Sequence, residues 1–384
     1  MKLTQYGDYF YLYLLFLTFI PAIVLALKGI STKYYGLVVS IGMVYLIMGK
    51  TIGLAMFGMF LIGEIIVIYM YLSLRKKTDN KYLYWVFLFM SMIPIIITKV
   101  AGLTKYSSYI GFIGLSYISF KVIQIIIEIY DGRITKIKFI DFINFILFFP
   151  TLSSGPIDRW KRFEENLNTK LEKDEYINEY LLVGLRKIFI AIVYKFIIAY
   201  LIDTYWLLMI PKEVSIFNSI NYMYSYTMYL FFDFAGYSLF AIGTSYVFGI
   251  KTPENFNMPF LSKDMKEFWT RWHISLSRWF GDYIFSRFVL NSMRKKRFKS
   301  RVTASHVAQI ITMFVMGLWH GLTIYYIIYG IYQGVALVLT DIYQRKSKFY
   351  KKNKNKKWFN CIQVVITFHI VCFGMLIFSG YLFK

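Results

Sequence analysis

Long apolar runs separated by short polar connections dominate the chain. A helix needs roughly 20 apolar residues to cross a bilayer core about 30 Å thick, and tilt accommodates somewhat shorter or longer runs. By this criterion the pattern predicts about ten membrane-crossing helices. Their predicted ranges are 9–27, 34–48, 52–74, 82–98, 109–130, 180–206, 222–250 (long enough to contain a break), 305–319, 322–339 and 358–383.

Two further segments are apolar without fitting a full crossing. The range 139–152 is short and contains Pro150 near its end, which favours a re-entrant or interfacial piece. From Ser262, a candidate N-cap with Asp264 close behind it, apolar residues recur at three- and four-residue spacing as far as Phe280. This stripe predicts an amphipathic helix in the membrane interface, either as part of a site or as a surface helix without chemistry.

The composition excludes an ordinary soluble protein. The chain has 44 Lys and Arg against 21 Asp and Glu, a net charge of +23, yet only 17% of it is charged and 58% is hydrophobic. A basic nucleic-acid binder keeps its charge on a solvated surface, so we expect no nucleic-acid partner. Without a visible repeat or soluble domain, residues 1–384 are predicted to form a single membrane domain of an all-α polytopic integral membrane protein, located in the cell membrane.

The bases orient the predicted helices. They concentrate in the ranges 75–81, 133–138, 159–173, 263–301 and 345–357, and the predicted spans allow all five to share one face. Lys and Arg beside membrane helices collect on the cytoplasmic side and contact anionic membrane lipids there. The N-terminus is therefore predicted to be extracellular.

Two histidines are candidates for chemistry. His320 closes an apolar span that starts near a basic block, which carries it roughly 22 Å into or across the bilayer. An ionisable group at that depth is a functional candidate, and desolvation favours its neutral form. The alternative is a buried histidine that bonds to a neighbouring helix. His273 is either a second active-site residue or a contact to lipid headgroups. The two cysteines, Cys361 and Cys372, offer no metal-ligand spacing, so no metal site is expected.

Five strings carry a family resemblance: PTLSSGPIDRW (150–160), DFAGYSLFAIGTSYVFGI (233–250), PENFNMPF (253–260), EFWTRWHISLSRWFGDYIF (267–285) and MGLWHG (316–321). With them the chain resembles the membrane-bound O-acyltransferases over most of its length, and within that family the Gram-positive branch that transfers D-alanine. The alginate O-acetylating branch is similar through both histidine motifs. The resemblance implies a ring of about ten to twelve transmembrane helices, with interfacial and re-entrant helices, around a central funnel. It also implies that residues 251–321 form the active-site segment.

The resemblance implies an acyl donor, partners and roles. The donor is a D-alanyl thioester on the 4'-phosphopantetheine arm of a small acidic carrier protein (DltC-like), so the chain itself binds no cofactor. The acceptor is a hydroxyl on the outer side, for D-alanylation of lipoteichoic acid, with a DltD-like membrane partner and optionally a small membrane peptide. His320 falls on the catalytic position, where it acts as general base. His273 binds or orients the thioester, or donates to the oxyanion.

Further residues receive candidate roles from their positions. Trp319 and Arg271 neighbour the histidines and are predicted to bind substrate. Asp233 either binds the D-alanyl ammonium or caps backbone amides at a helix end. His306 and His369 are expected to be structural.

A docking surface for the acidic carrier is predicted between the two histidine motifs, as an apolar knob beside a basic cluster. Binding of anionic lipid is the rival role for the same bases. The predicted docking residues are Phe288, Val289, Leu290, Arg294, Lys295, Lys296 and Arg297.

Two other functions are compatible with the sequence. One is O-acetylation of an exported polysaccharide with the same two histidines. The other is a transporter or lipid flippase without covalent chemistry, because buried ionisable groups and broken spans also occur in transporters.

Overall fold

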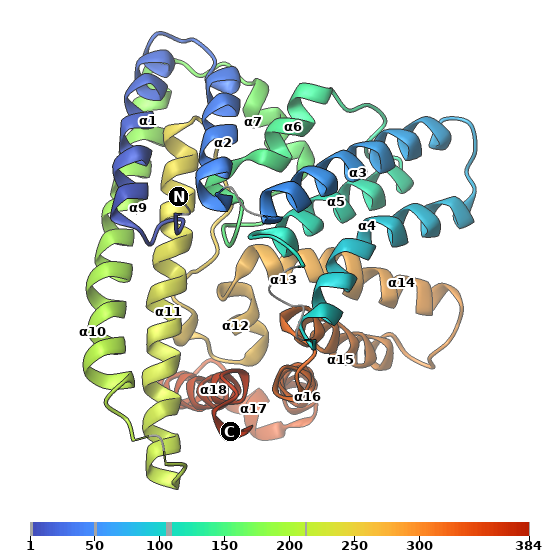
Figure 1. Cartoon of the computed structure of the whole chain (residues 1–384). Coiled ribbons are helices and arrows are strands. Elements are labelled where there is room, and N and C mark those ends of the chain that lie inside the picture. Colours follow the sequence, from blue (N-terminus) through green and yellow to red (C-terminus); the bar gives the residue numbers. More distant parts are fainter. Residues whose placement is uncertain (1–2, 50–51, 105–109, 212, 384) are drawn as a thin grey trace. The chain divides into compact units, whose positions relative to one another are not determined.

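The computed structural model describes residues 3–49, 52–104, 110–211 and 213–383 (Figure 1). In these ranges the regular structure is helical, and strand-like pairing is limited to an isolated antiparallel bridge between Phe256 and Trp272. Seven of the described helices are long and apolar enough to cross a membrane. The predicted all-α polytopic membrane fold is confirmed.

The chain divides into two compact units. Unit 1 consists of Met1–Ile192 and Gly236–Pro253, and unit 2 of Val193–Ala235 and Glu254–Lys384. One long helix, α11, contributes residues to both. The single membrane domain and the ring around a central funnel stay predictions.

Unit 1 begins with helix α1, whose first turn is capped by Asp8: its carboxylate accepts from the backbone N–H groups of Phe10 and Tyr11. Helices α3, α4 and α5 pack against one another. The helices of this unit are α1 (Tyr9–Leu27), α2 (Lys33–Met48), α3 (Ile52–Arg75), α4 (Lys81–Ala101), α5 (Leu115–Tyr130), α6 (Phe139–Leu147), η2 (Phe149–Thr151), α7 (Trp160–Asn168), α8 (Lys173–Glu175), η3 (Tyr176–Leu181) and α9 (Leu182–Ile192).

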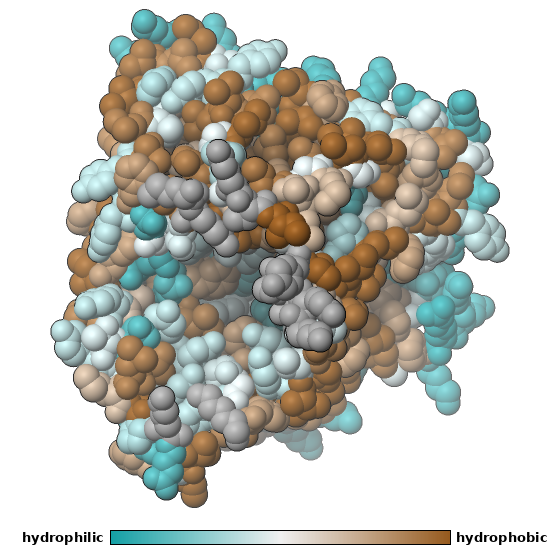
Figure 2. All heavy atoms as spheres, in the orientation of Figure 1, coloured by the Kyte–Doolittle hydropathy of each residue, from teal (hydrophilic) through white to brown (hydrophobic). Residues whose placement is uncertain are grey.

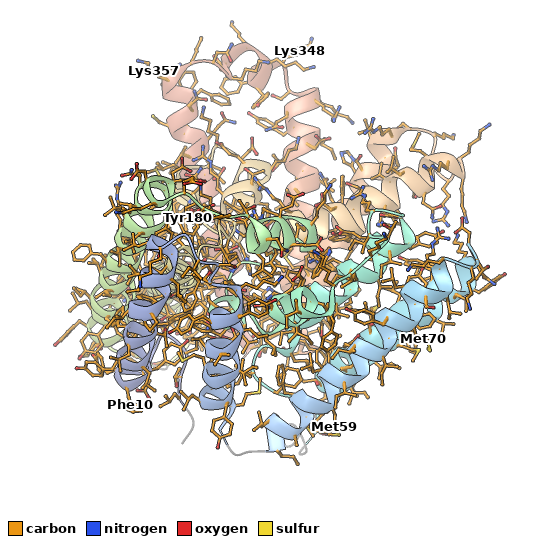
Figure 3. All side chains as sticks on the ribbon, turned by 90° about the horizontal axis from the view of Figure 1, so that it is seen from above. Phe10, Met59, Met70, Tyr180, Lys348 and Lys357 are labelled. Atoms are coloured by element: carbon orange, nitrogen blue, oxygen red, sulfur yellow. The ribbon has the colours of Figure 1, made fainter. Side chains whose placement is uncertain are left out.

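Apolar side chains cover the outside of these helices, as expected for surfaces that face lipid. Phe10 on α1 and Met59 and Met70 on α3 are exposed and point outward (Figure 3). Figure 2 shows hydrophobic residues over much of the visible face, with hydrophilic residues among them.

The predicted spans of unit 1 agree with the helices in position. Ranges 9–27, 52–74 and 82–98 correspond to α1, α3 and α4, and each of these helices can cross a membrane. Helices α2 and α5 have 16 residues each, and the predicted start of the latter at Tyr109 lies outside the described residues. The nine residues of α6 reach about 14 Å. That is too short for a crossing, as predicted for 139–152.

The predicted span 180–206 is part of a helical stretch that alternates α and π turns from Lys173 to Leu207. Its last parts are η4 (Val193–Ala199), α10 (Tyr200–Ile202) and η5 (Asp203–Leu207). π turns widen a helix and occur frequently at functional sites.

Unit 2 contains a bundle in which α16 packs against α15 and α18. Lys348 and Lys357 lie at the two ends of the basic connection between α16 and α18 (Figure 3). The remaining helices are α11 (Ile216–Val247), η6 (Pro259–Leu261), α12 (Met265–Arg271), α13 (Ile274–Phe280), η7 (Gly281–Phe285), α14 (Ser286–Arg294), α15 (Arg301–His320), α16 (Ile324–Lys346), α17 (Lys348–Asn353), α18 (Lys357–Phe378) and η8 (Tyr381–Phe383). Helix α11 is unbroken.

The prediction of one helix from Ser262 to Phe280 was wrong. The helix starts later, with Asp264 as its N-cap, and it is interrupted at His273, which separates α12 from α13. The apolar stripe is buried inside the protein instead of facing outward. Its residues are Met265, Phe268, Trp269, Trp272, Leu276, Trp279 and Phe280.

Candidate active site

His320 is the last residue of α15, and aromatic rings surround its imidazole. The ring centroid lies 4.6 Å from that of Trp319 and 4.8 Å from that of Phe378, which meets it edge-on. Tyr326 stacks on it at 5.8 Å, and Tyr329 lies at 6.1 Å. The histidine is half-buried. These contacts come from α15, α16 and α18 and fix the plane of the imidazole ring.

Glycines bring α15 and α16 close enough to form this aromatic cage. A Cβ at Gly317 would lie 2.4 Å from the carbonyl oxygen of Tyr326, and one at Gly330 would lie 2.6 Å from that of Met313. A Cβ at Gly321 would lie 2.5 Å from the Tyr326 ring. The glycines of the MGLWHG string are therefore required by helix contact and by the ring that stacks on His320.

His273 occupies the break between α12 and α13. Its backbone is left-handed, with φ +44° and ψ +52°, which is uncommon for a residue with a side chain. The chain holds this conformation by pairing with the preceding segment: Asn257 N–H donates to Arg271 O, and Ile274 N–H donates to Asn255 O, both at 2.9 Å. Motifs PENFNMPF and RWHIS thus form one local unit.

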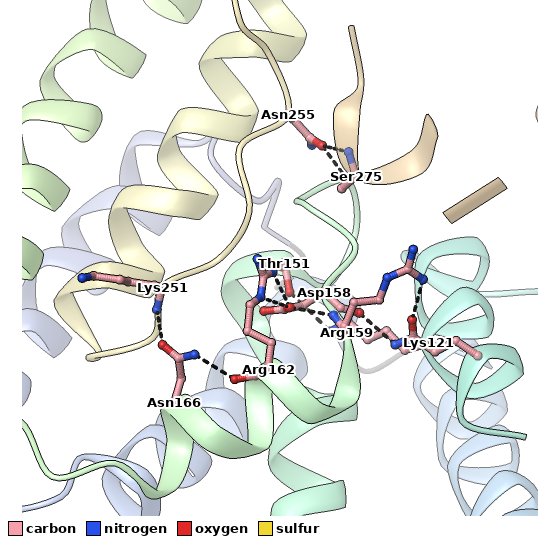
Figure 4. Close-up of polar contacts among 10 residues, drawn as sticks. Lys121, Thr151, Asp158, Arg159, Arg162, Asn166, Lys251, Asn255 and Ser275 are labelled. Atoms are coloured by element: carbon pink, nitrogen blue, oxygen red, sulfur yellow. Dashed lines mark hydrogen bonds and ion pairs between the residues drawn. The ribbon is translucent and has the colours of Figure 1, made fainter. Parts of the chain in front are cut away.

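Asn255 also caps α13. Its side-chain oxygen accepts from the hydroxyl of Ser275 at 2.6 Å and from the Ser275 backbone N–H at 3.2 Å (Figure 4). Both residues are buried. Asn255 is a structural residue of the site that sequence reasoning missed, although it lies inside a family string.

The environment of His273 keeps its imidazole neutral. The side chain is buried, and the ring meets the Phe234 ring edge-on at 4.8 Å. Burial lowers the pKa of His273 from its ordinary value to about 3. A neutral imidazole can donate one hydrogen bond and accept another, which suits an orienting or oxyanion-binding role.

Helix α11 passes close to both histidine environments within unit 2. Phe234 contacts His273, and Tyr226 lies close enough to interact electrostatically with Tyr326 and Tyr329 of the His320 cage. Tyr226 and Phe234 are about 12 Å apart along the helix axis. Helix α12 in turn packs against α16 and α18. The two histidine motifs therefore belong to the same helix bundle.

The other predicted substrate-binding residues have internal partners. Trp319 packs on His320. Arg271 donates to Glu267 at 2.6 Å on α12. Asp233 lies inside α11 and forms an ion pair with Lys195 of η4, so its alternative role as a helix-end cap was wrong. Sequence reasoning missed Lys195 because its partner is distant along the chain.

The predicted docking surface is partly exposed. Val289 is buried, at 5% exposure, and cannot contact a partner, so its prediction as a docking residue was wrong. Leu290 and Met293 of α14 are exposed, and Phe288 is half-buried. Exposed bases follow directly: Arg294, Lys295, Lys296 and Arg297. Leu290, Met293 and these bases form an apolar and basic surface, which we call the α14 surface.

A buried polar cluster holds the PTLSSGPIDRW string in unit 1. Lys121 of α5 donates to Phe145 O at 3.0 Å. It also donates to Thr151 Oγ1 at 3.3 Å (Figure 4). Asp158 pairs with Arg162. The sequence places Lys121 inside a predicted span, and that was the signal that could have found it.

A second polar cluster joins three helices of unit 2 around Asp341 of α16. Its carboxylate accepts from Lys266 of α12 and from Arg345, each at 2.5 Å, and lies 2.8 Å from Nε2 of His306 on α15. His306 therefore has a structural contact, as expected. His369 is exposed, and its Nδ1 lies 2.7 Å from Val365 O.

Among the described residues, no group of three or more His, Cys, Asp or Glu side chains is arranged to hold a metal ion. The fold and the site together define a multi-pass membrane protein in which a buried histidine, His273, and a half-buried one, His320, lie in the same helix bundle.

Residues 79–383 match the family described as MBOAT, membrane-bound O-acyltransferase family. The chain belongs to this family and is a membrane acyltransferase, which confirms the resemblance inferred from the five strings.

Similarity to individual proteins indicates which branch of this family the chain resembles most fully. The chain is 40% identical over 389 residues to the teichoic acid D-alanyltransferase of Bacillus subtilis, covering 98% of both proteins. It is 39% identical over 398 residues to the enzyme of the same name from Streptococcus thermophilus, covering 99% of this chain and 96% of that one. To the probable alginate O-acetylase AlgI of Pseudomonas syringae pv. tomato it is 33% identical over 236 residues, covering 60% of this chain and 42% of the relative.

Proposed function

We propose that this protein transfers D-alanine from a carrier-protein thioester on the cytoplasmic side to a hydroxyl on the outer side, for D-alanylation of lipoteichoic acid. The observation that carries the proposal is His320 at the end of α15, held in an aromatic cage within a family string. The near full-length similarity to two teichoic acid D-alanyltransferases supports the choice of acyl group.

The chemistry requires one base and one leaving group. A neutral His320 accepts the proton of the acceptor hydroxyl as its oxygen attacks the thioester carbonyl. The tetrahedral intermediate collapses with cleavage of the C–S bond, and the imidazolium returns the proton to the departing thiolate. His273, which burial keeps neutral, donates to the oxyanion or orients the carbonyl. Its low pKa prevents it from acting as a second charged group in the site.

The acyl group itself is a cation, so its path requires a negative or acceptor group. Asp233 is the candidate, and its pair with Lys195 gives it a resident counter-ion. We propose that the D-alanyl ammonium replaces Lys195 at one carboxylate oxygen during transfer. The carrier's 4'-phosphopantetheine arm supplies the thioester, and the acidic carrier docks on the α14 surface by charge steering and apolar contact. A DltD-like membrane partner and a small membrane peptide are further candidate partners.

The direct test incubates purified protein with a carrier that holds labelled D-alanine. We expect loss of label from the thioester, reduced 10²- to 10⁴-fold in His320→Gln, because general-base catalysis has that magnitude. The matched control is His369→Gln, a histidine exposed on α18, which should leave the rate unchanged. No loss of label, despite verified carrier binding and supplied acceptor, contradicts the proposal.

Polysaccharide O-acetylation is the second candidate. The similarity to alginate O-acetylases favours it, but covers a smaller part of both chains. It predicts transfer from an acetyl donor in the same assay.

A further inference from the structure

A buried amide lies one helical turn from the His320 cage. Gln333 of α16 is fully buried, at 0% exposure, and both its Nε2 and its Oε1 lack a hydrogen-bond partner within the described part of the chain. A buried side-chain amide is ordinarily paired, because leaving it unpaired is destabilising. An orphaned amide at this position points to a ligand that completes its hydrogen bonds.

Helices α16 and α18 meet at Gln333, one helical turn along α16 from the cage. Tyr329, four residues before it on α16, contacts His320, and Phe378 of α18 contacts both of these rings. Gly374 lies one turn before Phe378, and a Cβ there would be 2.5 Å from Gln333 Nε2. The missing side chain at Gly374 therefore provides the space that the amide occupies. Gln333 lies roughly one helical pitch, about 5.4 Å, from the level of the cage.

Two more unpaired polar atoms lie on α15. Gln309 Oε1 and Thr312 Oγ1 are buried without a partner among the described residues. Thr312 precedes His320 by two four-residue steps, and Gln309 precedes Thr312 by one three-residue step, so all three share a face. From Gln309 to His320 the helix rises about 16 Å. Gln309, Thr312 and Gln333 are thus three residues of α15 and α16 with buried, unpaired polar atoms among the described residues.

Along their helices these three residues lie between the basic ends of α15 and α16, which carry Arg301, Arg345 and Lys346, and the His320 cage. Their polar atoms are hydrogen-bond donors and acceptors without charge. A linear arm with amide groups matches this chemistry. In a pantetheine thioester only two methylene groups separate the sulfur from the nearest amide nitrogen. When the thioester carbonyl lies at His320, that amide lies at the level of Gln333.

We propose that Gln333 binds the amide of the acyl-donor arm nearest to the thioester and thereby holds the thioester carbonyl at His320. This inference rests on the proposed function, and it names a binding residue that adds to the two histidines.

The test replaces Gln333 with methionine, which is unbranched, apolar and similar in size. Because an unpaired buried amide is removed, Q333M should unfold at the same temperature as the unaltered protein or a higher one. The value of kcat/KM for the D-alanyl carrier should fall roughly tenfold or more, as expected for the loss of a hydrogen bond to substrate. The matched control is Tyr332→Phe, next to it on α16. The Tyr332 hydroxyl donates to Ile370 O at 2.8 Å, so this variant should lose thermal stability and keep its kcat/KM.

A second measurement identifies the group that Gln333 binds. The carrier is loaded through an arm analogue in which methylene replaces the amide nearest the thioester. The unaltered protein should use this donor poorly, and Q333M should process it at the same rate as the unaltered protein does. If the substitution Q333M lowers the rate by the same factor with the natural arm and with the analogue, Gln333 contacts something else, such as a file of water molecules, and the inference is overturned.

Unchanged kcat/KM in Q333M also overturns it. If Q333M and Q333L both fail to fold, Gln333 is structural and the inference is wrong. If the unaltered protein does not consume the thioester at all, the proposed function itself has failed, which is a separate result.

Discussion

Substitution of Gly317 by alanine tests whether close packing of α15 and α16 builds the site. The new Cβ would lie 2.4 Å from Tyr326 O and 3.1 Å from Gly330 Cα, whereas ordinary contact begins at 3.4 Å. The helices must therefore separate by about 1 Å at this point, since the obstructing atoms belong to the backbone and cannot rotate away. Because Tyr326 stacks on His320, this displacement changes the cage directly.

The expected effects follow from that displacement. Overpacking of a closed contact costs typically 1–3 kcal/mol of stability, and a misplacement of about 1 Å at a reacting group can lower the rate by ~10². We expect Gly317→Ala to show a lower unfolding temperature in detergent and about a hundredfold slower loss of D-alanyl label from the carrier. Gly330→Ala should do the same, and the double variant should be less severe than the sum, because both changes disturb one contact.

Gly63→Ala on α3 is the matched control. It also lies inside a membrane helix, but a Cβ there meets nothing within 4 Å. It should be neutral or stabilising by up to about 1 kcal/mol. The reasoning is refuted if Gly317→Ala keeps its rate within twofold and unfolds at the temperature of Gly63→Ala.

Three further predictions concern the active-site segment. Asn255→Ala removes the α13 cap and should lower stability by about 1–2 kcal/mol in thermal unfolding. Asn255→Asp keeps the acceptor oxygen and should therefore lose less stability. Equal losses of stability in the two variants would contradict the capping role. Because the folded-state pKa of His273 is about 3, the unfolded chain takes up a proton that the folded chain refuses as pH falls below about 6.5. Protonation of His273 in the unfolded chain should therefore lower the free energy of unfolding by up to ~1.4 kcal/mol per pH unit. In His273→Asn the free energy of unfolding should depend less on pH between pH 6 and pH 4, about the window that the depressed pKa defines. An unchanged pH dependence would exclude His273 as its cause. Reversal of the exposed bases on the α14 surface to glutamate should weaken carrier binding more at low salt than at high salt, measured by titration with the carrier, and salt-independent binding would assign these bases to lipid. The bases are Lys295, Lys296 and Arg297.

Much of the membrane architecture could be predicted because the bilayer imposes a length and a composition on each crossing. The apolar runs at 9–27, 52–74 and 82–98 are helices at nearly those bounds. The family strings identified the acyltransferase class, and the match of residues 79–383 to the family confirms it. His320 at the end of α15 and the glycines before and after it belong to one of these strings.

Only the tertiary structure decided how the polar residues pair. Periodicity predicted one helix through His273, but pairing with Asn255 and Asn257 breaks it and turns the backbone left-handed. Val289 belongs to an apolar run that suggested an exposed knob, and packing buries it. The lysine partner of Asp233 comes from a different helix.

The burial of Gln333 likewise could not be predicted from the sequence. In sequence it is a polar residue within a span, and only the contact between α16 and α18 reveals that its amide is buried, one helical turn along α16 from the His320 cage. The physical reason is that a sequence pattern reports which faces are apolar and how long each helix is. Hydrogen-bond partners, buried amides and backbone breaks depend on residues distant along the chain, and folding alone brings these together.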